Sequence, residues 1–160
     1  MALMIRYKDM TATGHALIGT IIAAKIGNPY IALPIAFFSH IVADLIPHWD
    51  AGTHGRSKKK EQLRFEAGID VIVGFVASYT LVFMVFPGTN LIYVFINIIV
   101  AQGIDWLTAP YYMFNFKMQP FKFFHRISSI TNTKLDKPWG IVTQAVVILL
   151  LLFILLNSRC

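Results

Sequence analysis

Long apolar runs alternate with short polar segments along this chain, and the runs predict an all-helical integral membrane bundle. Three runs reach the roughly 20 residues that an α-helix needs to cross the ~30 Å hydrocarbon core of a bilayer. Two shorter runs are separated only by Gly27, Asn28 and Pro29, a turn cluster that predicts a helical hairpin. The five predicted transmembrane helices cover residues 13–26, 30–46, 65–86, 91–114 and 139–156.

The positive charges predict how the five helices are oriented in the membrane, because short cytoplasmic loops hold most lysine and arginine residues. With a cytoplasmic amino terminus, only Lys25 and Arg159 of the 14 basic residues fall outside, which leaves 12 on the cytoplasmic side. Cytoplasmic loops are predicted at 50–64 and 115–138, and the second could lie in the membrane interface as an amphipathic stretch. We interpret residues 1–9 as a disordered extension of one transmembrane domain that spans 1–160.

Composition agrees with a membrane protein. Hydrophobic residues make up 56% of the chain and charged residues 14%, against roughly 25% charged residues in soluble domains. The net charge of +6 follows from the predicted topology, and the aromatic residues lie mostly within apolar runs, so no nucleic-acid partner is expected. The single cysteine, Cys160, excludes an intramolecular disulfide and a cysteine-based mechanism. The expected partner is the lipid bilayer.

Ionisable residues inside membrane spans are costly and usually mark a function. His40 and Asp44 are four residues apart and therefore share one helix face, and Pro47 follows at the helix end. The first and third predicted helices begin at the cytoplasmic leaflet and the second and fourth end there, so the other ionisable residues reach the same leaflet. They are His15, His48, Asp50, Glu66, Asp70 and Asp105. This segregation predicts one polar pocket that opens to the cytoplasm.

Histidine and carboxylate ligands without a thiol suit Zn²⁺ first and Mn²⁺ or Fe²⁺ next. The predicted metal ligands are His15, His40, Asp44, His48 and Asp50. Asp70 and Asp105 approach from the third and fourth helices, and we predict that they act in catalysis, as a base or in a second metal site. Alternatively, His40 and Asp44 could form a hydrogen-bonded pair that fastens two helices together.

Two motifs resemble those of a known family. They are Thr13-Gly14-His15, and the segment from Ser39-His40 through Asp44 to Pro47-His48-Trp49-Asp50. The chain is similar over residues 10–54 to the small bacterial membrane-bound metal-dependent hydrolases of the YdjM-like family. The resemblance implies metal binding by His15, His40 and Asp44, and it extends to His48 and Asp50.

We therefore predict a metal-dependent hydrolase in the bacterial inner membrane, with its site at the cytoplasmic leaflet. That depth favours an amphiphilic substrate, and a basic rim of Lys58, Arg64 and Arg126 favours an anionic one, such as a phospholipid or another phosphoester. The alternative is a non-enzymatic membrane protein, either a metal or proton carrier or a scaffold subunit. A carrier needs polar groups reachable from both faces, but the outer halves of the predicted spans contain no Asp, Glu or His.

Overall fold

The computed structural model describes residues 10–50, 58–131 and 135–157. The described residues form seven α-helices and no strand, which confirms the all-α prediction. The predicted extension 1–9 and part of the predicted loop 50–64 lie outside the described residues. The helices are α1 (Ala12–Lys25), α2 (Pro29–Asp44), α3 (Lys60–Val85), α4 (Leu91–Ala101), α5 (Gly103–Met113), α6 (Phe121–Thr131) and α7 (Trp139–Asn157).

Polar side chains set the beginnings of several helices. The side chain of Thr11 accepts a hydrogen bond from Gly14 N at the start of α1, and Asn28 accepts one from Tyr30 N at the start of α2. These caps satisfy backbone N–H groups that have no partner within the helix. Pro29 occupies the first position of α2, where it lacks only an N–H that would be unsatisfied anyway. The predicted hairpin of α1 and α2 is therefore present.

The predicted helix over 91–114 is broken in the middle. α4 ends at Ala101, α5 begins at Gly103, and the two axes are bent by 49°. At the break, Gln102 Nε2 donates a hydrogen bond to the carbonyl oxygen of Ala12 at a distance of 2.9 Å. α6 lies within the predicted loop 115–138, in the segment for which the sequence indicated an amphipathic stretch.

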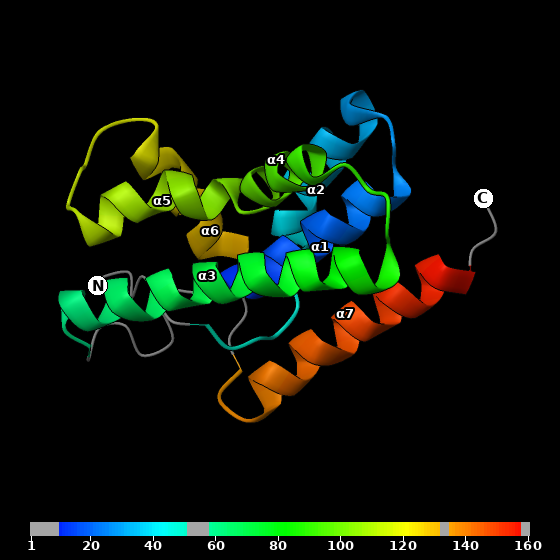
Figure 1. Cartoon of the computed structure of the whole chain (residues 1–160). Helices are drawn as coiled ribbons and strands as arrows, with labels where there is room; N and C mark the ends of the chain where they lie inside the picture. Colours follow the sequence, from blue (N-terminus) through cyan, green and yellow to red (C-terminus); the bar gives the residue numbers. More distant parts are fainter. Residues whose placement is uncertain (1–9, 51–57, 132–134, 158–160) are drawn as a thin grey trace.

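Two described helices, α3 and α7, are long and apolar enough to cross a membrane, and the bent pair α4 and α5 makes a third if it counts as one span. α1 with 14 residues and α2 with 16 are shorter. The structure thus contains two to three candidate membrane spans, and the five-span topology stays a prediction. Figure 1 shows α1, α3, α4 and α7 extending along one common direction of the molecule.

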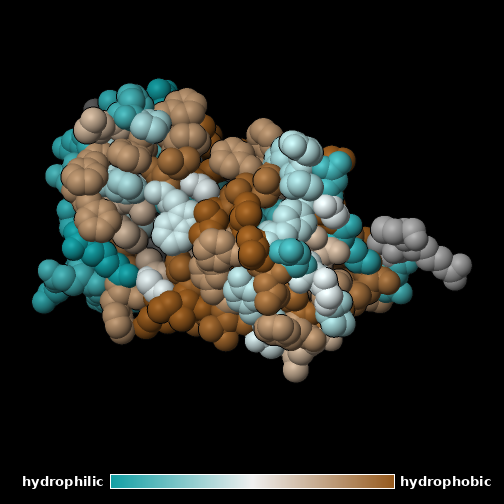
Figure 2. All heavy atoms as spheres, turned by 45° about the horizontal axis from the view of Figure 1, so that its top comes forward, coloured by the Kyte–Doolittle hydropathy of each residue, from teal (hydrophilic) through white to brown (hydrophobic). Residues whose placement is uncertain are grey.

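The distribution of side chains differs from that in a soluble protein. Large apolar residues on α3 and α7 are exposed, among them Ile72, Phe83 and Phe153, whereas the interior holds many polar side chains. Soluble proteins almost never bury such groups in this number while exposing apolar faces. Figure 2 shows apolar residues across the middle of one face and hydrophilic residues gathered at the end where α3 begins. This arrangement fits helices surrounded by lipid.

α1 is the central helix and packs against α2, α3, α4 and α7. Gly19 lies where α1 meets α4. A methyl group on Gly19 would come within 2.8 Å of the Asn97 carbonyl oxygen and of Ala101 Cβ. Small residues permit such a close approach of two helices, which is a common packing mode in membranes. The missing side chain at position 19 therefore sets the distance between α1 and α4.

We expect Gly19→Ala to lower the thermal unfolding temperature of the detergent-solubilised protein, because the new methyl group would meet a backbone oxygen that cannot move alone. The matched control is Gly68→Ala in α3, where nothing lies within 4 Å of the added atom. The intrinsic helix preference of Ala over Gly, about 1 kcal/mol, favours both variants. If Gly19→Ala stabilised the protein as much as Gly68→Ala, the proposed close approach would be wrong.

Candidate metal centre

Two histidine rings from neighbouring helices lie at the centre of the buried polar group. His15 of α1 and His40 of α2 stack with ring centroids 3.7 Å apart and planes inclined by 11°. Asp44, one turn after His40, bridges the two rings. Its Oδ1 lies 3.3 Å from His15 Nε2 and its Oδ2 lies 3.4 Å from His40 Nε2. All three side chains are almost fully buried.

Asp105 joins this group from the first turn of α5. Its Oδ1 lies 3.6 Å from His40 Nε2. Three residues each offer one ligand atom, and these atoms all lie within 4.8 Å of one another. The residues are His15, His40 and Asp105, and together they could hold a metal ion. The Asp105 side chain is 24% exposed, whereas the two histidines are closed off. Asp105 is therefore the member of the group that is partly exposed at the surface.

A backbone carbonyl orients the His40 ring. Its Nδ1 lies 2.8 Å from the carbonyl oxygen of Ala101. A carbonyl oxygen can only accept, so Nδ1 donates its proton to it and Nε2 faces the carboxylates. Metal-binding histidines commonly donate their second ring nitrogen in this way. Within the described residues, neither ring nitrogen of His15 has a partner with hydrogen-bond geometry.

A divalent cation would balance the charges of this group. Two imidazoles face the buried carboxylate of Asp44 and the partly exposed carboxylate of Asp105, and carboxylates withdrawn from water are costly without a positive charge beside them. Protons on both stacked rings would put two like charges 3.7 Å apart, whereas one divalent ion balances both carboxylates. Ligand atoms around a tetrahedral ion at about 2.0–2.2 Å lie roughly 3.3–3.6 Å apart. His40 Nε2 and Asp105 Oδ1, two of the three candidate ligand atoms, lie 3.6 Å apart, at this spacing.

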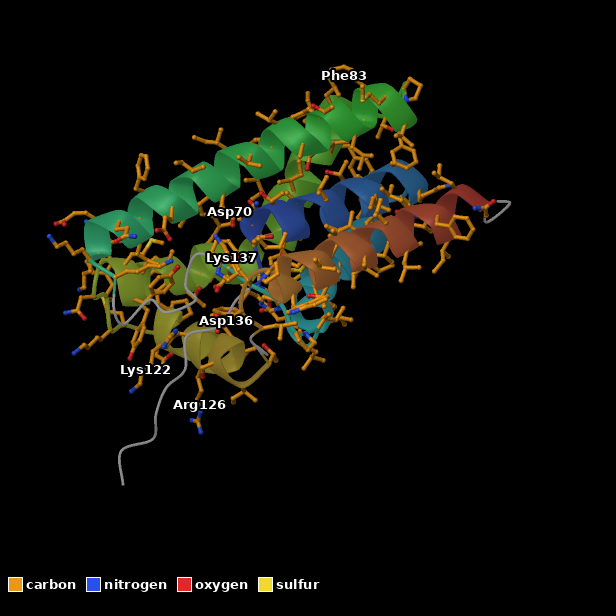
Figure 3. The ribbon with its side chains drawn as sticks, turned by 90° about the horizontal axis from the view of Figure 1, so that it is seen from below. Asp70, Phe83, Lys122, Arg126, Asp136 and Lys137 are labelled. Atoms are coloured by element: carbon orange, nitrogen blue, oxygen red, sulfur yellow. The ribbon has the colours of Figure 1, made fainter. Side chains whose placement is uncertain are left out.

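The amino end of α1 is held by acidic side chains of other helices. Asp70 Oδ2 accepts from Ala12 N at 2.7 Å, and Asp70 Oδ1 accepts from Thr13 N at 3.2 Å and Thr13 Oγ1 at 2.7 Å. Asp44 Oδ1 accepts from Met10 N at 2.9 Å. Figure 3 shows Asp70 on α3 close to the start of α1. Asp70 thus lies outside the ligand group and fixes the helix that carries His15.

Sequence reasoning missed a second positioning residue, Gln144 of α7. Its Oε1 accepts a hydrogen bond from Thr11 Oγ1 at 2.5 Å, and its Nε2 donates to the Trp49 carbonyl oxygen at 2.6 Å. Gln144 is buried and so connects the cap of α1 to the segment that follows α2. The sequence did contain a signal for this role, because a glutamine within the apolar run 139–156 needs hydrogen-bond partners in a membrane.

The two predicted ligands after α2 lie outside the group that could hold a metal. His48 is buried, and its Nδ1 is hydrogen-bonded to the carbonyl oxygen of Ile46. Asp50 faces a neighbouring cavity instead. Asp105, which the sequence suggested for catalysis, takes a place among the candidate ligands. The structure thus brings together residues from α1, α2 and α5.

A cavity of about 480 Å³ adjoins the group between α3 and α5. Three carboxylates, from Asp50, Asp70 and Asp105, form part of its wall. The remaining wall is mostly apolar and includes Leu63, Val71, Trp106, Met113 and Phe114. Asp105 belongs both to the metal-binding group and to the cavity wall, so the cavity provides access to the group.

Of the three predicted rim residues, the structure brings Arg64 to this cavity. Arg64 Nη2 donates to the Met113 carbonyl oxygen at 2.7 Å, and its guanidinium lies 4.8 Å from the centre of the Phe114 ring. Lys58 forms an ion pair with Glu66. Figure 3 shows Arg126 pointing away from the helix bundle.

Comparison of the chain with protein-family models, curated proteins and solved structures gives no match. The resemblance to the YdjM-like family stays a prediction from the sequence. What the described residues contain is a helical protein with candidate membrane spans and a buried group of His15, His40 and Asp105 that could bind a metal.

We expect Asp70→Asn to lower the unfolding temperature, because the amide Nδ2 would face N–H donors of α1 in place of a carboxylate oxygen. Hydrogen bonds to a charged group contribute about 1.5–3 kcal/mol, and the carboxylate also interacts favourably with the helix dipole. Glu66→Gln, one turn earlier on α3, is the control and should change stability less, because exposed ion pairs contribute little. An Asp70→Asn protein as stable as the wild type would contradict the positioning role.

Proposed function

We propose that this protein is a membrane-embedded metal-dependent hydrolase with its site at the cytoplasmic leaflet of a bacterial inner membrane. His15, His40 and Asp105 hold the ion, and Asp44 lies beside both imidazoles. One observation carries the proposal. His40 donates its Nδ1 proton to the Ala101 carbonyl oxygen, so its Nε2 faces the buried carboxylate of Asp44 and the partly exposed carboxylate of Asp105.

The donor set favours Zn²⁺, with Mn²⁺ or Fe²⁺ next, because it combines imidazole nitrogen and carboxylate oxygen without a thiol. When bound, such an ion supplies Lewis acidity and makes water nucleophilic near neutral pH. Asp44 contributes in a second way, since its Oδ1 also accepts from Met10 N and so ties the two rings to the start of α1.

We assign Asp50 as the general base, because its carboxylate lines the same cavity as Asp105. A base must come within hydrogen-bond reach of the water that it activates, and the cavity wall beside Asp105 is the place where water and substrate meet the ligand group. Asp70 also lines this cavity, and its oxygens accept three hydrogen bonds from Ala12 and Thr13, which suits a positioning role. In this proposal Asp105 is a ligand and Asp70 a positioning residue.

The cavity supports an amphiphilic, anionic substrate, such as a phospholipid or another phosphoester. Its volume of about 480 Å³ falls in the range of small-molecule sites, about 300–1,000 Å³, enough for a headgroup and part of an acyl chain. Trp106 and Phe114 offer apolar walls for the chain, and Arg64 offers a guanidinium that matches phosphate geometry. The five-span topology would place this cavity at the cytoplasmic side.

Metal analysis tests the ligand set. Protein purified without chelators should contain Zn, Mn or Fe at near one ion per chain, and His40→Ala and Asp105→Asn should each lose most of it. His125→Gln is the matched control, because His125 is also buried but stacks on Tyr111 away from the group. We expect this control to keep its metal. Wild-type protein without any bound metal would refute the proposed function.

Activity assays separate the base from the ligands. On a panel of phosphoesters and lipid esters, Asp50→Asn should keep its metal and lose turnover by about 10²-fold or more, whereas Asp105→Asn should lose both. Wild-type turnover in Asp50→Asn would show that another group is the base. A metal-loaded wild-type protein that hydrolyses no ester would favour the alternative of a carrier or scaffold.

A further inference from the structure

α6 presents a surface that combines positive charge with exposed apolar side chains. Lys122 and Arg126 lie one turn apart, and Phe123 and Ile130 beside them are 54% and 74% exposed. We call these four residues the α6 face. α6 is not among the candidate membrane spans, so crossing a bilayer does not explain its exposed apolar side chains.

Contacts with α5 fix which side of α6 points outward. His125 and Ser128 are the buried residues of this helix, and the His125 ring stacks on Tyr111 of α5 with centroids 4.4 Å apart. At 3.6 residues per turn, these two positions lie on the opposite side of the helix from the α6 face. Figure 3 shows Lys122 and Arg126 pointing away from the bundle. The α6 face therefore lies on the outer surface of the structure.

The sequence around α6 is rich in basic residues and poor in acidic ones. Between Asp105 and Asp136 the chain contains no acidic residue, and its basic residues there are Lys117, Lys122, Arg126 and Lys134. Two cations at i and i+4 repel each other and slightly destabilise a helix. An external anion would relieve this repulsion. Basic residues interleaved with aromatic and aliphatic side chains are typical of helices that lie in the interface of anionic bilayers.

Chain connectivity holds α6 close to such a bilayer. Seven residues connect Met113, the last residue of α5, to Phe121, and another seven connect Thr131 to Trp139, the first residue of α7. Seven extended residues reach at most about 25 Å. α6 therefore stays near the ends of two candidate spans, where the effective concentration of lipid headgroups is high.

We propose that the α6 face docks on the anionic phospholipid headgroups of the membrane in which the chain is embedded. Lys122 and Arg126 contact the phosphates, and Phe123 and Ile130 enter the boundary between headgroups and acyl chains. This proposal is independent of metal binding and hydrolysis, because α6 contributes no residue to the ligand group or the cavity wall.

The test uses the full-length chain with Cys160→Ser and Ile130→Cys, labelled at position 130 with an environment-sensitive fluorophore. The protein is placed in nanodiscs of phosphatidylcholine alone or mixed with phosphatidylglycerol, each doped with lipid that carries a spin label at the headgroup. We expect phosphatidylglycerol to increase quenching and shift the emission to shorter wavelength. Adding Lys122→Gln and Arg126→Gln should lower the docking equilibrium about 30-fold, the equivalent of about 1 kcal/mol per charge.

Lys59→Gln with Lys60→Gln is the matched control, because it removes two exposed basic residues at the start of α3 and leaves α6 intact. This control should keep the response to phosphatidylglycerol. Equal quenching in both lipids, or a wild-type response after Lys122→Gln and Arg126→Gln, would overturn the proposal. A probe that stays in water in both nanodiscs would also overturn it, in favour of an acidic protein partner for this face.

Discussion

The amino end of α1 is partly buried in the helix bundle, and its first backbone N–H groups, which have no partner within the helix, need acceptors from elsewhere. Asp70 accepts from Ala12 and Thr13, and Thr11 provides acceptors for Gly14 and His15. These bonds fix the rotation and depth of α1. Because His15 lies one turn into the helix, they also fix the ring that stacks on His40.

The same end of α1 connects the site to the helices around it. Gln102 at the break between α4 and α5 donates to the Ala12 carbonyl oxygen, and Gln144 of α7 accepts from Thr11. The bend at Gln102 sets the direction of α5 and therefore the place where Asp105 meets His40. A metal ion bound to His15, His40 and Asp105 would balance the carboxylates of this cluster and so stabilise the fold that builds it.

The sequence predicted some of these features well because they depend on local spacing. Four-residue spacing alone places His40 and Asp44 on one helix face, and the predicted hairpin brings His15 beside His40. Other features depend on contacts between distant residues. Gln102 and Gly103 interrupt the apolar run, but neither residue by itself predicts a bend, so the direction of α5 and the contact of Asp105 with His40 could not be derived from the sequence. Asp70 looks the same in the sequence whether it caps a helix or acts on a substrate, and only its hydrogen bonds to α1 distinguish the two roles.

X-ray absorption spectroscopy at the edge of the co-purified metal tests the central claim most directly, because it reports the atoms bound to the ion without knowledge of a substrate. The account predicts a first shell of nitrogen and oxygen atoms only, with multiple scattering from two imidazole rings, and loss of one ring contribution in His15→Ala. A spectrum with sulfur in the first shell, or with no imidazole contribution, would contradict a centre built from His15, His40 and Asp105.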